Sequence, residues 1–172
     1  MNTYIILLRG VNVGGKNILP MKELKLALCD SGYKNVKTYI QSGNILVSSV
    51  NNPEPQIGTL IESNFGFKPE LLALSNSEYS LAVTNNPFNE LEGKVVHFYF
   101  CKETPKINLT KIEQLSSPTE NHKLIGNVFY LHAPDGIGRS KLVSNIEACL
   151  GVAATGRNLN TVNKLKEMAK NA

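Results

Sequence analysis

The chain has 172 residues, of which 42% are hydrophobic, and its formal net charge is +4. This apolar content is ordinary for a globular protein, so a hydrophobic core is possible. The charge is only mildly basic, and the longest basic cluster is Lys34-Asn-Val-Lys37. Such a weak cluster is more typical of a solvated surface than of a dedicated nucleic-acid-binding protein.

The cysteines and the first apolar run indicate the cellular setting. Cys29, Cys101 and Cys149 lie far apart, without a CxxC motif or a histidine at metal-ligand spacing. We therefore expect small buried residues in a reduced, cytoplasmic setting, with no metal and no cofactor. The run from Tyr4 ends at Arg9 and is too short for a signal peptide or a membrane span. A soluble protein without a membrane partner is expected.

The first part of the chain predicts the order β-α-β-β-α-β. Tyr4–Leu8 is nearly all apolar and predicts a buried strand, and Pro20 is tolerated at the first position of a helix that Ser31-Gly32 closes. The further expected elements are strands at 36–40 and 45–49, the turn Gln41–Asn44 between them, a helix ending at Gly66, and a strand at 70–74. This is the order of the ferredoxin-like motif.

The second part repeats this order. The expected elements are a strand at 95–101, a helix at 109–115, strands at 123–125 and 128–132, one helix over 142–150, a strand near 152–155 and a terminal helix around 160–169. Gly43-Asn44-Ile45 also resembles Gly126-Asn127-Val128, as a duplication would require. Chance similarity of two short α+β halves is the alternative.

The predicted fold is therefore α+β, with duplicated ferredoxin-like units and antiparallel or mixed sheets. We expect a first unit at residues 1–75, a connecting helix and loop at 76–93, and a second unit with a C-terminal helix at 94–172.

The three arginines carry the main functional signal. Each lies in a stretch rich in Gly, Asn, Ser or Thr, at residues 9–17, 135–141 and 155–161. Arginine binds oxyanions in a planar, bidentate manner, and such stretches expose backbone N–H groups. We therefore expect an anion-binding surface assembled from distant loops, in or near the groove between the halves.

The stretch from Gly10 to Asn17 contains most of the P-loop pattern G-x-x-x-x-G-K-[ST]. However, Asn17 stands where a hydroxyl would bind Mg²⁺, and Pro20 delays the start of the helix whose N-terminus should face the phosphates. A nucleoside triphosphatase is therefore disfavoured. A looser anion-holding loop and a merely structural glycine-rich connection are both left open.

The candidate ligand-binding residues are Arg9, Asn12, Gly14, Gly15, Lys16, Asn17, Gln41, Ser42, Asn44, Arg139, Ser140, Lys141, Arg157 and Asn158. The arginines would clamp a phosphate or carboxylate of a small molecule, and the Gly14-Gly15 backbone would approach it. The structural alternatives are a turn at Gln41–Asn44 and helix capping by Ser140 and Asn158.

Two further functions are left open. RNA or single-stranded nucleic acid could stack on aromatic residues of a sheet face, which requires Tyr99 and Tyr130 to be exposed, although neither strand has the RNP1 pattern. An enzyme could use the same loops to stabilise charge in a transition state. No catalytic residue can be named, because His97, His122 and His132 lack metal-ligand partners and no G-x-S-x-G motif is present.

Four segments resemble one bacterial family, the "domain of unknown function 1697". They are Leu8–Asn17, Thr38–Asn44, Gly138–Leu142 and Ala154–Val162. At Gly156-Arg157-Asn158-Leu159 the family often has Ala-Arg-Asn-Trp, so an aromatic role is not expected at Leu159. The resemblance implies a paired ferredoxin-like α+β fold and no activity or catalytic residue, since the family is uncharacterised.

Overall fold

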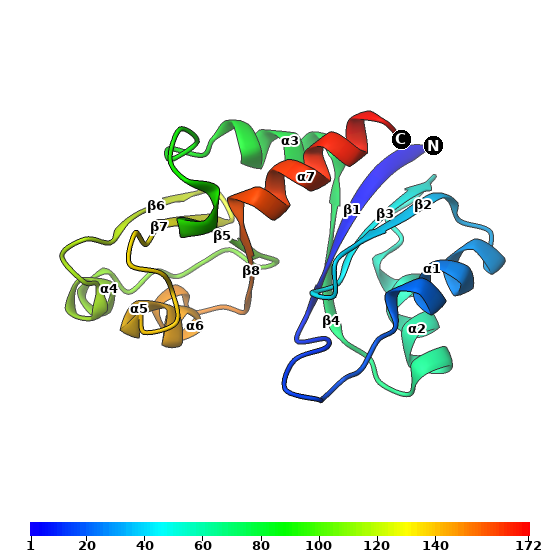
Figure 1. The fold of residues 1–172 in the computed structure, drawn as a ribbon, viewed down its shortest axis with the longest axis horizontal. Coiled ribbons are helices and arrows are strands. Elements are labelled where there is room, and N and C mark those ends of the chain that lie inside the picture. Colours follow the sequence, from blue (N-terminus) through cyan, green and yellow to red (C-terminus); the bar gives the residue numbers. More distant parts are fainter. The chain divides into compact units, whose positions relative to one another are not determined.

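The structure, a computed structural model, describes residues 1–172 as two compact units. The first unit comprises residues 1–81 and 164–172, and the second comprises residues 82–163. Each contains a four-stranded antiparallel sheet with interleaved helices (Figure 1). The α+β fold with two similar ferredoxin-like halves is confirmed.

The sheet of the first unit has the strand order β2-β3-β1-β4. Its strands are β1 (Asn2–Arg9), β2 (Lys34–Tyr39), β3 (Asn44–Ser49) and β4 (Glu70–Ser75). The expected buried strand is the central β1, in which Ile5 to Leu8 are completely buried because neighbouring strands pair with it on both sides. The C-terminal residues are held to β2, since Lys37 Nζ donates to the carbonyl oxygen of Asn171 at 3.1 Å.

Two helices cover one face of this sheet, α1 (Met21–Asp30) and α2 (Glu54–Phe65) (Figure 1). Leu24 and Leu28 of α1, with Ile57 and Ile61 of α2, are fully buried against the sheet. Burying such a side chain contributes about 1.5–3 kcal/mol. The chain continues from β4 into α3 (Asn76–Thr84).

The start of α1 differs from the expectation. Pro20 is the residue before the helix, with an extended backbone at φ −67° and ψ 110°, and Met21 is the first helical residue. Pro20 has no N–H, but its carbonyl oxygen accepts the first hydrogen bond of the helix, from Leu24 N at 3.0 Å.

The sheet of the second unit has the strand order β6-β7-β5-β8. When β5 to β8 are matched with β1 to β4, this is the same order as in the first sheet. Its strands are β5 (Val96–Cys101), β6 (Asn121–Ile125), β7 (Val128–His132) and β8 (Ala154–Asn158). The 3₁₀-helix η1 (Gly93–Val95) precedes β5, and the helices within the unit are α4 (Leu109–Leu115), α5 (Lys141–Ser144) and α6 (Ile146–Leu150). The last helix, α7 (Leu159–Lys170), begins in the second unit, and its residues from Lys164 belong to the first.

The expectation of one helix over residues 142–150 is wrong. Asn145, with φ −120° and ψ 21°, separates α5 from α6. Its side-chain Nδ2 donates to the carbonyl oxygen of Lys141 at 2.9 Å. A side chain that bonds to the backbone in this way competes with the backbone hydrogen bonds of a helix. The helix is therefore interrupted at Asn145, although apolar residues keep helical spacing on both sides of it.

The last strand also lies later than the expected residues 152–155. β8 pairs with β5 from Cys101 opposite Ala154 to His97 opposite Asn158. Gly and Asn are weak strand formers, but pairing with a partner strand along the whole of β8 outweighs local propensity. Arg157 and Asn158 therefore belong to a sheet.

No helix in the chain has both the length and the apolar character that crossing a membrane requires.

Candidate functional site

The glycine-rich stretch forms a tight hairpin. Val13 and Lys16 form an antiparallel bridge, Lys16 N donates to the carbonyl oxygen of Val13 at 3.0 Å, and Gly14 and Gly15 between them have φ values of 59° and 73°. Two adjacent positive φ angles are typical of the two-residue hairpin turn that glycine favours. Lys16 lies on this exposed hairpin, well before α1 begins at Met21. The helix N-terminus that a P-loop places at its lysine is therefore not there.

Asn12 holds this stretch in place. Its Oδ1 accepts from Leu19 N at 2.7 Å, and its Nδ2 donates to the carbonyl oxygens of Leu19 at 3.0 Å and Gln41 at 2.8 Å. Asn12 also has a left-handed backbone, φ 55°, which asparagine tolerates better than most residues. One side chain thus closes the loop over 12–19 and binds it to the turn that contains Gln41. Two of the stretches singled out in the sequence are brought together here.

The turn between β2 and β3 is built from buried contacts. Asn44 is fully buried, and its Nδ2 donates to the carbonyl oxygen of Tyr39 at 2.9 Å and to Ser42 Oγ at 3.1 Å. Gly43 has φ 91°, and a Cβ there would lie 2.7 Å from the Cβ of Leu8. Asn44 therefore stabilises the turn from inside, whereas Gln41 and Ser42 are exposed.

The turn begins one residue earlier than predicted, at Ile40. This residue has φ 47°, a left-handed conformation that is rare for a β-branched side chain. Strain of this kind persists only where surrounding contacts determine it, and here Gly43 and Asn44 pack the turn onto β1.

The cations of the first unit differ in their surroundings. Arg9 Nη1 donates to Glu70 Oε2 at 2.7 Å, so a carboxylate compensates part of its charge. Lys16 is exposed and has no acidic partner. Asn17, also left-handed at φ 51°, donates to the carbonyl oxygen of Gly10 at 3.3 Å.

The stretch 135–141 of the second unit contains capping contacts and acidic neighbours. Ser140 is the N-cap of α5: its Oγ accepts from Val143 N at 3.2 Å and donates to Glu120 Oε2 at 2.6 Å. Asp135 accepts from Thr119 Oγ1 at 2.6 Å. Arg139 and Lys141 are exposed, and in the chain they flank Ser140, whose hydroxyl bonds to Glu120. The acidic groups make this stretch less favourable for an anion than the loops of the first unit.

The third stretch is largely structural. Arg157 is 9% exposed in β8, and its Nη1 donates to the carbonyl oxygen of Gly156 at 2.8 Å. Asn158 Oδ1 accepts from Thr161 N at 2.9 Å, so it caps the start of α7. That the three arginines bind one ligand together stays a prediction.

The aromatic residues of the second sheet do not form an exposed stacking platform. Tyr99 is 6% exposed and Tyr130 is completely buried. Burial raises the pKa of each phenol to about 12, and the Tyr130 hydroxyl donates to the carbonyl oxygen of Ala82 at 2.5 Å. The nucleic-acid hypothesis required both rings at the surface, and neither ring is there.

The histidines and cysteines form no metal centre. His97 is buried, its Nε2 has no hydrogen-bond partner, and desolvation lowers its pKa despite a bond to the backbone of Lys94. Desolvation also lowers the pKa of His122. No three side chains of the types His, Cys, Asp and Glu are placed to hold one ion.

Sequence reasoning did not single out Glu120. Its carboxylate accepts from Ser117 N at 2.8 Å as well as from Ser140, and its charge adds to the desolvation that raises the pKa of Tyr99. It lies 20 residues from Ser140. No short motif could have indicated this pair.

The chain belongs to the family described as "Protein of unknown function (DUF1697)", whose sequence model matches residues 1–130. The resemblance to this family is thus confirmed, and of the four segments that indicated it, Leu8–Asn17 and Thr38–Asn44 lie within the matched residues. Among solved structures, the chain is similar to the conserved bacterial protein SP0830 from Streptococcus pneumoniae, with 24% identity, a TM-score of 0.68 and 98% of each chain covered. At this identity the similarity shows the fold alone. No curated protein matches the chain.

Proposed function

We propose that this protein binds a small molecule that carries a phosphate or carboxylate group. The binding surface is formed by residues 10–19 and 40–43 of the first unit, which we call the loop surface. The observation that carries the proposal is the position of Asn12, whose side chain bonds to both segments and holds them together beside the unpaired Lys16.

The charge of the loop surface favours an anion. Neither segment contains Asp or Glu, and Lys16 is exposed on the hairpin. A lysine ammonium offers three rotatable donors to an oxyanion. The backbone at Gly14 and Gly15 carries no side chain that would keep a ligand away, and the exposed amide of Gln41 adds a donor that is fixed near Asn12.

Preorganisation supports the same conclusion. Several residues of the loop surface have positive φ angles, among them Asn12, Gly14, Gly15, Asn17 and Ile40. Backbone held in such conformations by side-chain bonds loses less freedom when a ligand binds. A single ammonium with a few neutral donors implies weak binding of inorganic phosphate, with a Kd of about 1 mM, equivalent to about 4 kcal/mol.

The sequence also indicates three cations of the second unit as candidate ligand-binding residues, Arg139, Lys141 and Arg157. The test of the proposal therefore includes this unit. Arg157 is mostly buried, whereas Arg139 and Lys141 are exposed on either side of Ser140, which bonds to Glu120. Their variants show whether the second unit contributes to the same ligand.

The experiment is thermal unfolding with inorganic phosphate, pyrophosphate or citrate, each compared with NaCl at equal ionic strength. A ligand at 100 times its Kd adds about 2.7 kcal/mol of stability, which is several degrees for a chain of this length. We expect at least one anion to raise the melting temperature. Lys16→Gln should abolish the rise, while the matched change Lys22→Gln on the exposed face of α1 should preserve it.

Two results would overturn the proposal. One is the absence of any shift beyond that of NaCl for all three anions. The other is a shift that survives Lys16→Gln but disappears in Arg139→Gln or Arg157→Ala, since the binding would then not use the loop surface.

A further inference from the structure

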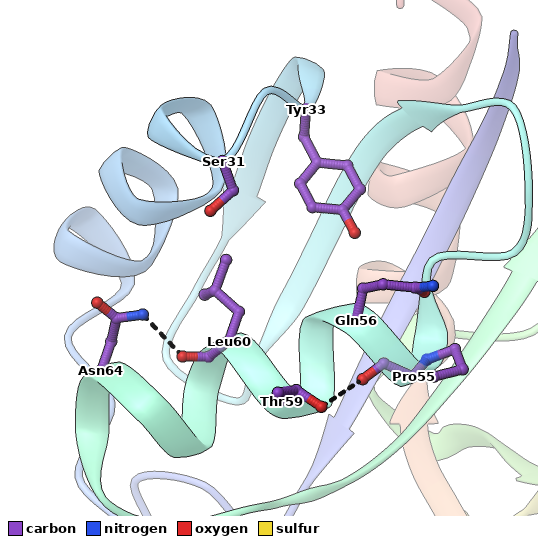
Figure 2. Close-up of a pocket in the computed structure, with 7 residues that line it drawn as sticks. All are labelled: Ser31, Tyr33, Pro55, Gln56, Thr59, Leu60 and Asn64. Atoms are coloured by element: carbon purple, nitrogen blue, oxygen red, sulfur yellow. Dashed lines mark hydrogen bonds between the residues drawn. The ribbon is translucent and has the colours of Figure 1, made fainter.

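The first unit contains a second surface feature, an open groove of about 640 Å³ between the end of α1 and helix α2. Ser31 and Tyr33 line one side, and the exposed face of α2 from Pro55 to Asn64 lines the other. Figure 2 shows the Tyr33 side chain extending across the groove with its hydroxyl directed toward α2. The volume is within the range that small-molecule sites usually have.

No charged side chain lines this groove. Its one titratable group is the phenol of Tyr33, and burial raises the pKa of that phenol, so it is neutral at physiological pH. A charged ligand would give up water here without gaining an opposite charge. The groove therefore differs in chemistry from the loop surface and favours an uncharged ligand.

The polar side chains along α2 offer hydrogen-bond acceptors to the groove. Thr59 Oγ1 donates its proton to the carbonyl oxygen of Pro55 at 3.1 Å, and Asn64 Nδ2 donates to that of Leu60 at 2.8 Å (Figure 2). Each bond uses a donor of the side chain, so the lone pairs of the Thr59 oxygen and of the Asn64 carbonyl oxygen can still accept a further hydrogen bond. Gln56 adds an amide with both donor and acceptor.

The apolar part of the lining is small. Tyr33 and Leu60 are partly buried against the core of the unit, and both line the groove. A sugar ring matches this combination, because its C–H face contacts apolar side chains while its hydroxyl groups donate to acceptors. A nucleobase is held best when it stacks between two planar side chains, whereas Tyr33 is the one aromatic ring that lines the groove.

We propose that the groove formed by Tyr33, Gln56, Thr59, Leu60 and Asn64 is a binding site for a neutral saccharide. This inference does not depend on the anion-binding proposal. It uses other residues of the same unit and another class of ligand.

The test is ¹H–¹⁵N NMR of the full chain, titrated with D-glucose, D-galactose, maltose and cellobiose at millimolar concentrations, and with adenosine as the nucleobase probe. We expect at least one saccharide to shift the backbone signals of Ser31, Tyr33 and Leu60 and the side-chain amides of Gln56 and Asn64. Signals of residues 12–18 should not move.

Variants then connect the shifts to the groove. Tyr33→Phe keeps the ring and removes the hydroxyl, and Gln56→Ala removes an exposed amide, so each should weaken saccharide binding several-fold. The matched control is Gln114→Ala on the exposed face of α4, which should leave binding unchanged. Three results would overturn the inference: no saccharide-induced shift, shifts that Tyr33→Phe and Gln56→Ala leave unaltered, or adenosine shifting these signals more than any saccharide.

Discussion

Gly156 lies directly opposite Tyr99 in the pairing of β8 with β5, and the tyrosine ring covers it. A Cβ on Gly156 would lie 2.9 Å from the ring carbon Cε1 of Tyr99. The ring is buried between this glycine and the apolar cluster that includes Phe129 and Leu131. The missing side chain of Gly156 therefore provides the space that Tyr99 occupies.

Gly156→Ala should destabilise the chain by about 1–3 kcal/mol, because the added methyl group forces the Tyr99 ring from its position. The measurement is urea unfolding at equilibrium. The double variant Gly156→Ala, Tyr99→Val should show less than the sum of the two single effects, since the smaller side chain makes room for the methyl group. Strictly additive effects would contradict the contact.

Asn12→Ala should loosen the loop surface, because it removes the two bonds to Leu19 and the bond to the Gln41 carbonyl. We expect a loss of about 1–3 kcal/mol and faster hydrogen exchange at the Leu19 amide. Asn89→Ala, at an exposed asparagine of the second unit, serves as the control. Unchanged exchange at Leu19 would show that Asn12 does not organise the loop.

Stability should fall as the pH is lowered from about 7 toward 5. Burial holds the pKa of His97 below 6.5, and the pKa of His122 is lowered in the same way. The unfolded chain takes up these protons near pH 6.5, whereas the folded chain does so only at lower pH. The unfolded state thus binds more protons within this window and is favoured there.

Urea unfolding at a series of pH values tests this dependence. The double variant His97→Gln, His122→Gln should lose less stability between pH 7 and pH 5 than the original chain does, whatever its stability at pH 7. An equal loss in both proteins would rule out the two histidines as the source.

The three thiols should react at different rates. The expected burial is confirmed for Cys101 and Cys149 but is wrong for Cys29, which is exposed. Burial, reinforced by the charge of Glu147, raises the pKa of Cys101 to about 11, and burial also raises that of Cys149. Because the thiolate is the reactive form, iodoacetamide should modify Cys29 alone in the folded protein and all three in urea. Mass spectrometry of the alkylated peptides distinguishes these sites, and rapid modification of Cys101 under native conditions would contradict the prediction.

Much of the fold could be predicted because its signals are local. The apolar run at Tyr4–Leu8 marks the central strand, and helix α4 was predicted with its observed bounds, Leu109–Leu115. Gly66 ends α2 in a left-handed conformation at φ 82°, as its position suggested. These features follow from backbone preferences and from the period of side chains within one element.

The polar stretches were harder to interpret, because one residue type can serve as a cap, a turn or a ligand. Ser140 and Asn158 are caps, and Asn44 is buried inside a turn. Gln41 lies beside Asn12 only through a bond across 29 residues. A bond between residues so far apart produces no repeating pattern by which the sequence could reveal it.

The sequence by itself determined the order of strands and helices in each half, the similarity of the halves and the family. Only the tertiary structure decided where β8 pairs, that Asn145 divides a helix, and which of the polar residues are occupied by internal bonds. The physical reason is one of range. Apolar periodicity and backbone preference act within a few residues, whereas the partner of a polar side chain depends on which distant segment the folded chain brings beside it.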